Sequence, residues 1–127
     1  MKAIYLTTDG DTTTELPVPL EIEGYGCGVI EMSGKVRTGF TDNLYLCCDI
    51  CEESYVNNIK MPVLRYISRN RNGLVNKPID HVIWLRVMRP NISSIRLYIS
   101  DEHGKIVSVE DNFLNCTLLF VPAPAEK

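Results

Sequence analysis

Hydrophobic and polar residues alternate most regularly between Ser94 and Ile99. One side of an extended chain there carries leucine and isoleucine, and the other carries serine, arginine and tyrosine. This period of two is typical of a strand with one buried face. The tetrapeptide Asp101–Gly104 that follows is polar and ends in glycine, and an apolar run resumes at Ile106. The pattern therefore predicts a β-hairpin over residues 92–109.

Short segments of the same kind recur along the chain between turn-forming residues. Leu44–Ile50 is apolar on both faces, which predicts a central strand of a two-layer core. Pro17 and Pro19 favour an edge strand. Three glycines at positions 24, 26 and 28 indicate a kink or the close approach of another segment. The remaining expected strands are residues 2–8, 20–23, 29–32, 63–67, 81–88 and 114–121.

Three other stretches are expected to lie outside strands. Residues 9–14 are polar and rich in turn formers, and residues 68–78 combine an Asn-Gly pair, a proline and repeated asparagines, so both are predicted as loops. Residues 51–61 show no clear period and are predicted as a short helix or a long loop. No segment has the pattern of a helix of three turns.

Eight or nine short strands without a long helix predict an all-β sandwich or jelly roll of about eight antiparallel strands. Each such strand has one apolar face to bury, and a single open sheet would leave that face in water, so two sheets must pack together. With 127 residues, the chain is expected to form one domain over residues 1–121. Residues 122–127, with two prolines in three positions, are predicted as a flexible tail.

Composition narrows the class further. Hydrophobic residues make up 45% of the chain and charged residues 23%, which excludes disordered and collagen-like proteins. The apolar runs are far shorter than the roughly 20 residues that span a bilayer, so no membrane association is expected. The N-terminal residues lack the pattern of a signal peptide, and we therefore expect an intracellular protein.

The net charge of −3 is unevenly distributed. Residues 1–59 carry −7, residues 60–105 carry +6 and residues 106–127 carry −2. One interpretation is that strands from both parts interleave, so that the charges intersperse on the surface. The other is that faces of opposite sign attract one another between subunits.

Cysteines are the residues best suited to chemistry, and five are present. Cys48 and Cys51 form a C-x-x-C pair that Cys27, Cys116, His81 or His103 could complete as a zinc site. The chain has no second C-x-x-C, and Cys47 and Cys48 point to opposite faces of an extended strand. We therefore expect small buried thiols rather than a metal centre, a redox motif or a catalytic pair, and no cofactor.

Arginines gather in the middle of the chain, where Tyr66 and Trp84 are available for stacking on bases. The sequence pI of about 5.3 argues against a dedicated nucleic-acid protein, so any such contact is expected to be weak. The acidic pairs Glu52-Glu53 and Asp101-Glu102 are interpreted as solvated loops rather than catalytic dyads. The sequence therefore gives no reason to expect an enzyme.

Three stretches in a fixed order carry a family resemblance: LPVPLEIEGYGCGVIEMSG, LYLCCDICEESYVNNIKMPVLRYI and IRLYISDEHGKIVSVEDNFLNCTLLF. Over about residues 16–121 the chain resembles the single jelly-roll minor capsid, or penton-like, proteins of Polinton (Maverick) virus-like transposons and adintoviruses. The resemblance implies a single jelly roll that forms a homo-oligomeric ring, with a pentamer favoured. It further implies a virion location and a major capsid protein as partner.

Loops of contrasting charge are the expected contacts between subunits of such a ring. They contain the residues Glu52, Glu53, Arg69, Arg71, Asp101 and Glu102. The alternative from another class is a β-sandwich binding module without catalysis, of the trimeric ligand-like or carbohydrate-binding type. That alternative predicts a concave site with convergent polar and aromatic side chains.

Overall fold

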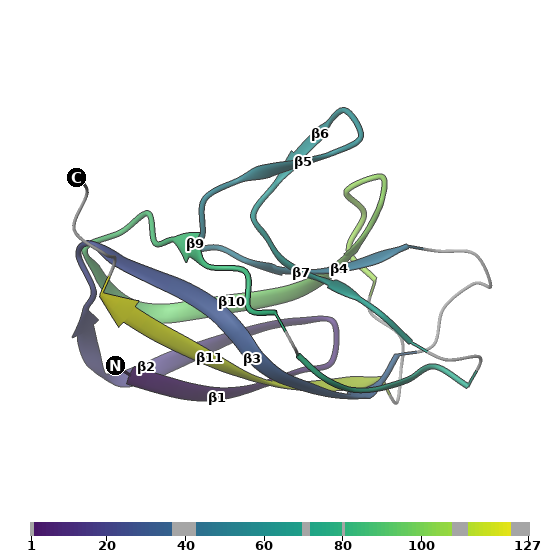
Figure 1. Ribbon diagram of the computed structural model, residues 1–127, viewed down its shortest axis with the longest axis horizontal. Coiled ribbons are helices and arrows are strands. Elements are labelled where there is room, and N and C mark those ends of the chain that lie inside the picture. Colours follow the sequence, from purple (N-terminus) through teal and green to yellow (C-terminus); the bar gives the residue numbers. More distant parts are fainter. Residues whose placement is uncertain (1, 37–42, 70–71, 80, 108–111, 123–127) are drawn as a thin grey trace.

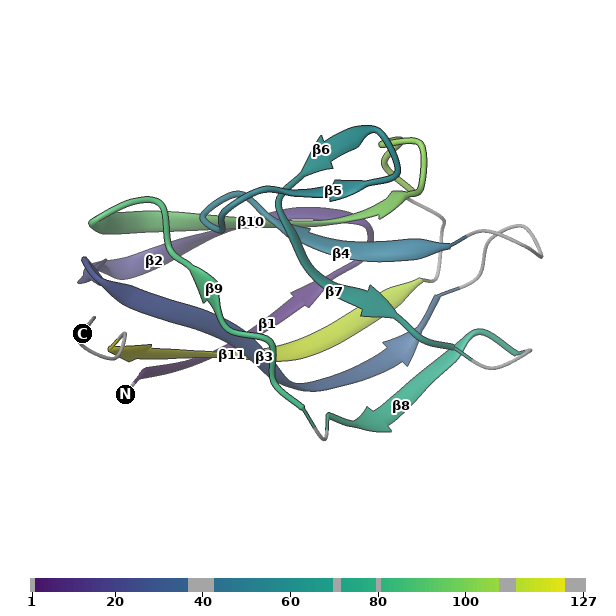
Figure 2. The same ribbon diagram turned by 45° about the horizontal axis from the view of Figure 1, so that its top comes forward.

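The protein is a sandwich of two antiparallel sheets, shown as two facing layers in Figure 2. The computed structural model describes residues 2–36, 43–69, 72–79, 81–107 and 112–122. The β1 sheet contains, in spatial order, β1 (Lys2–Thr8), β11 (Phe113–Pro122), β3 (Tyr25–Lys35) and β8 (Leu74–Pro78). The β2 sheet contains β2 (Asp11–Glu21), β10 (Asn91–Asp101), β4 (Leu44–Cys48) and β7 (Val63–Ile67).

Strand pairing identifies the winding. When these eight strands are taken in chain order, the first pairs with the last, the second with the seventh, the third with the sixth and the fourth with the fifth. All of these pairs are antiparallel. This nested arrangement is that of a jelly roll. The predicted fold class, an all-β single jelly-roll sandwich of about eight antiparallel strands, is therefore confirmed.

The core lies between the two sheets and is built by alternation along the strands. In β10, Ile95, Leu97 and Ile99 are at most 2% exposed, as their spacing predicts. The facing sheet contributes Leu114, Leu118 and Phe120 of β11, each fully buried. Burying one such side chain contributes about 1.5–3 kcal/mol, so the facing rows of apolar side chains hold the two sheets together.

Three shorter strands complete the fold. β5 (Ser54–Val56) and β6 (Ile59–Met61) form a hairpin that projects beyond the β2 sheet in Figure 1. The prediction of a helix or loop for residues 51–61 was wrong, because strands of three residues are too short to show a period. Asn57 takes a φ of 56° in the turn between them, a conformation that asparagine tolerates better than most residues.

The hairpin covers the outer face of β4. Val56 and Met61 pack there with Cys47, and Tyr45, Val63 and Tyr98 surround this second apolar cluster. β4 is therefore buried on both faces and lies between β10 and β7, as predicted for Leu44–Ile50.

Other boundaries differ from the sequence predictions. β2 begins at Asp11, so only residues 9 and 10 form the expected turn, and β8 occupies residues 74–78 within the predicted loop. Polar residues form these stretches because each strand lies at the edge of its sheet. The predicted strand at 81–88 was mostly wrong: only Leu85–Arg86 forms a strand, β9, paired with β3.

The predicted hairpin over residues 92–109 is only partly present. β10 pairs with β2 and β4, and its return arm makes one isolated bridge, Ser100 to Ile106. Residues 108–111 lie outside the described part of the chain. β11 extends to Pro122, which pairs with Tyr25, and residues 123–127 of the predicted tail are likewise outside the described residues.

Candidate functional site

The charged residues predicted for subunit contact lie at separate places on the sandwich. Glu52 follows the Cys48–Cys51 turn and is half-buried. Its backbone N–H donates to Arg86 O at 2.9 Å, and its Oε1 accepts from Arg86 N at 2.8 Å. Glu52 thus fixes the short strand β9 to the chain beyond β4. The neighbouring Glu53 is exposed.

Asp101 holds the turn after β10. Its Oδ1 accepts hydrogen bonds from the backbone N–H groups of His103 and Lys105, at 2.9 and 2.8 Å. Gly104, in the same turn, has φ 80°, and a Cβ there would lie 3.4 Å from Ile59 of the β5–β6 hairpin. The turn and the hairpin therefore contact each other, as Figure 1 shows at the top of the molecule.

Glu102 belongs to a small polar group at the end of β4. Its Oε2 accepts a long bond of 3.5 Å from Asn43 Nδ2, and Asn43 Oδ1 accepts from the Tyr66 hydroxyl at 3.2 Å. The rings of Tyr66 and Tyr45 pack edge to face, with centroids 5.5 Å apart. Burial, and after it the negative charge of Glu102, raises the pKa of Tyr45.

Arg69 lies beyond β7, and its Nη1 donates to Val36 O at 3.0 Å. This bond ties the region after β7 to the end of β3. Arg71 is outside the described residues. The five described members of the predicted contact set thus fall into three groups, which are Glu52 with Glu53, Arg69 alone, and Asp101 with Glu102. Glu52, Arg69 and Asp101 each bond the backbone of their own chain.

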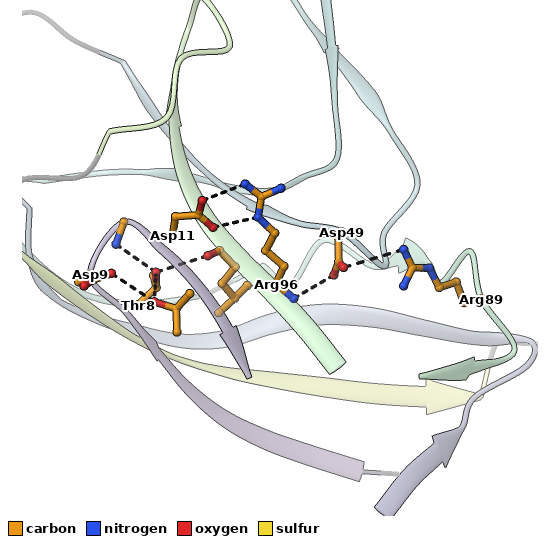
Figure 3. A network of polar contacts seen from close by, with 9 residues as sticks. Thr8, Asp9, Asp11, Asp49, Arg89 and Arg96 are labelled. Carbon is orange, nitrogen blue, oxygen red and sulfur yellow. Dashed lines mark hydrogen bonds and ion pairs between the residues drawn. The ribbon is translucent and has the colours of Figure 1, made fainter. Parts of the chain in front are cut away.

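Sequence reasoning missed the most connected polar group, which Figure 3 shows on the outer face of the β2 sheet. Arg96 of β10 makes two bonds of 2.9 Å to the Asp11 carboxylate of β2 and lies 4.8 Å from the centre of the Tyr98 ring. On its other side, Asp49 Oδ1 accepts from Arg96 N at 3.0 Å, and Asp49 Oδ2 lies 3.9 Å from Arg89 Nη2. The alternation of β10 placed Arg96 on this face, but Asp11 was assigned to a turn.

The thiols lie in the interior. Cys27, Cys48, Cys51 and Cys116 belong to the main core, and Cys47 lies under the β5–β6 hairpin. Burial raises the pKa of Cys47 and of Cys116 to about 12. Within the described ranges, no group of three or more His, Cys, Asp and Glu side chains could hold a metal ion. Both histidines are exposed at the surface.

The segment between β8 and β10, called the crossing segment, passes from the β1 sheet to the β2 sheet along β3, with which its strand β9 pairs. Gly28 of β3 is buried beneath it, and a Cβ on Gly28 would lie 2.5 Å from Val82 Cγ1 and 3.1 Å from both Ile83 O and Trp84 Cε3. Of the three glycines, Gly28 therefore marks a close approach of another segment, as predicted, whereas Gly26 has no neighbour nearer than 3.6 Å to its Cβ position. Ile83, Trp84 and Met88 on this segment remain 55%, 46% and 57% exposed.

A shallow hollow of ≈ 300 Å³ lies on the outer face of β1, β11 and β3. Six of its nine lining residues carry a hydroxyl, amide or carboxylate group, and one of the six is aromatic. The lining residues are Tyr5, Leu6, Thr7, Glu31, Met32, Ser33, Asn115, Cys116 and Thr117. Apart from Cys116, which was considered as a zinc ligand, the sequence gives no sign of these residues, because only the pairing of β1, β11 and β3 brings them together.

Comparison of the chain with protein-family models, with curated proteins and with solved structures found no match. Among the described residues, no helix has the length and apolar character needed to cross a membrane.

Proposed function

We propose that this protein is a structural, self-assembling capsid-like subunit of a virus or virus-derived element, of the minor capsid or penton-like kind. Jelly rolls serve as viral capsid subunits and also as lectins and cupins, so the fold permits the proposal and does not decide it. The resemblance in residues 16–121 favours the capsid class among these.

The observation that carries the proposal is the apolar surface of the crossing segment. Ile83, Trp84 and Met88 fall within six residues, and each leaves about half of its side chain in water. Trp and Met are enriched in the contacts between subunits, where such side chains become covered. Pairing of β9 with β3 and the close approach over Gly28 hold the segment in place. A second copy of the chain that packs on this surface removes it from water.

The β2 edge favours contact through side chains rather than strand addition. β2 is an edge strand, and its paired register is interrupted between Glu15 and Leu20, where Pro17 and Pro19 lie. Proline lacks the N–H donor that an added strand needs. A repeated contact between two different surface patches closes into a ring when the rotation permits, and a pentamer that meets a major capsid protein is the assembly we favour.

Size-exclusion chromatography with light scattering tests this proposal on the full chain. A ring gives a mass several times the 14.4 kDa of one chain, with a pentamer expected, and negative-stain microscopy then shows annular particles. The same measurement with a neighbouring capsid gene product tests the partner. A monomer at every accessible concentration would contradict the proposal.

Single substitutions locate the contact. Met88→Asp and Ile83→Asp each place a charge on the exposed apolar segment and are expected to shift the mass toward that of one chain. Tyr55→Asp is the matched control, because Tyr55 is 71% exposed on the β5–β6 hairpin. The six charged residues predicted from sequence stay a prediction, and Glu53→Lys tests the most exposed acidic member in the same way.

A further inference from the structure

We infer that the hollow on the outer face of β1, β11 and β3 binds a neutral oligosaccharide. This inference does not rest on the proposed function, because the hollow is separate from the exposed residues Ile83 and Met88 and its ligand is a different class of molecule. Its evidence is the set of side chains that the three strands bring together.

Register places the polar groups of the hollow in two adjacent rows. Tyr5, Thr117 and Glu31 lie opposite one another across β1, β11 and β3, and the next row contains Thr7, Asn115 and Ser33. Hydroxyl, amide and carboxylate groups thus converge on one shallow site. Together they supply the donors and acceptors that sugar hydroxyls require.

Two details prepare these groups for a ligand. Thr7 Oγ1 donates to Asn115 Oδ1 at 2.7 Å. This bond orients the amide, so that its two N–H donors point away from Thr7. The register of β3 against β11 shifts between Thr117 and Leu118, immediately beside the Glu31 row. Such bulges re-aim the side chains of a strand and recur next to binding sites.

One aromatic ring stands beside this polar set, because Tyr5 on β1 is 78% exposed and lines the hollow. The C–H face of a pyranose ring suits such a flat aromatic surface, whereas the edge of the sugar carries the hydroxyls.

Charge selects the kind of sugar. Glu31 is the one ionisable carboxylate among the lining residues, and none of those residues is a lysine or arginine. Glu31 repels a sialylated or sulfated sugar, and no basic side chain of the lining offsets that repulsion. Neutral sugars joined by equatorial β-linkages, which present flat C–H faces, fit the site best.

Amide chemical shifts of the full chain, measured during titration with triacetylchitotriose and with cellotriose, test the inference. Shifts are expected at Tyr5, Glu31, Asn115 and Thr117. Tyr5→Ala is expected to weaken binding by about tenfold because one stacking face is lost, and Tyr55→Ala, on the β5–β6 hairpin, leaves it unchanged. Glu31→Gln is expected to weaken binding of the neutral sugars and to relieve the exclusion of 3′-sialyllactose.

Several outcomes would overturn the inference. They are the absence of shifts with both neutral sugars, shifts confined to another face, equal effects of Tyr5→Ala and Tyr55→Ala, or preferential binding of sialyllactose by the unmodified chain. Thermal unfolding of each variant establishes that it is folded, and Thr7→Ala replaces any variant that is not. A monomeric protein that binds these sugars contradicts the proposed assembly and leaves this inference intact.

Discussion

Arg96 and Asp11 meet in a two-point ion pair across the outer face of the β2 sheet, with Nε to Oδ1 and Nη2 to Oδ2 both at 2.9 Å. The pair joins a central strand, β10, to an edge strand, β2. Its side chains are 41% and 37% exposed, so solvent screens much of the attraction. The pair therefore fixes how β2 aligns with β10 more than it stabilises the fold.

Replacing Asp11 with asparagine tests this interpretation through pH. The hydrogen bonds from Arg96 lower the pKa of Asp11 below its ordinary 3.8, so the contribution of the pair is complete above about pH 4. That contribution is lost as the pH falls through the lowered pKa that Asp11 has in the folded protein. At pH 7, Asp11→Asn is expected to cost about 0.5 kcal/mol of unfolding free energy, measured in urea. A cost that persists unchanged at pH 2 would contradict this account.

Gly28→Ala is expected to destabilise the sandwich by about 1–3 kcal/mol. The added methyl meets Val82 Cγ1 at 2.5 Å and the carbonyl of Ile83 at 3.1 Å, so the crossing segment must lift. Trp84 is the only tryptophan of the chain, and its fluorescence therefore reports that movement directly.

Gly26→Ala is the matched control for Gly28→Ala. It lies two residues away in the same strand, and its Cβ meets nothing closer than Leu85 O at 3.6 Å. Its unfolding free energy is expected to stay within about 0.5 kcal/mol of the unmodified chain. Equal effects at both positions would argue against the close approach.

Thiol labelling is expected to report global unfolding. All five cysteines are free and buried, and burial raises the pKa of Cys47 and Cys116 to about 12. Little thiolate therefore forms at pH 8. Labelling with an aromatic disulfide reagent should proceed only as fast as the protein unfolds, and all five thiols should react in denaturant. Rapid reaction of one thiol in the native protein would contradict the buried placement.

Asp101→Ala is expected to loosen the turn that contacts the β5–β6 hairpin. The change removes the acceptor of the His103 and Lys105 amides, at a cost of about 1–3 kcal/mol for bonds to a charged group. Amide exchange at residues 103 and 105 should accelerate, whereas Glu102→Ala, which removes one bond of 3.5 Å, should leave it nearly unchanged. An altered oligomer mass with normal exchange would instead assign Asp101 to a subunit contact.

Periodicity predicted those parts of the fold that bury a regular face. β10 and β4 were predicted because alternating or continuous apolar residues follow directly from burial between two sheets. The edge strands β2 and β8 were misread at their polar ends, since an edge strand can keep polar side chains and still bond along one side. The crossing segment was predicted as a strand because it is apolar, but most of it is not a strand, and its apolar residues cover Gly28 instead.

The surface was harder to predict than the core. Charged residues were selected by their clustering along the sequence, yet Asp101 accepts from the backbone of its own turn and Glu52 accepts from the backbone N–H of Arg86 in β9. The polar hollow depends on β1, β11 and β3, which come from both ends of the chain and from its first third. Such a site has no local signal, because only strand order and register bring its members together.

The nested pairing of the strands also constrains how the chain folds during synthesis. β1 and β2 precede the other strands along the chain, but among the described residues β1 pairs in its sheet with β11, and β2 pairs in its sheet with β10. Neither early strand is paired until almost the whole chain has been translated, so the sandwich closes late and through contacts distant in sequence. In the meantime the nascent chain exposes unpaired strand edges, and such edges are prone to aggregate.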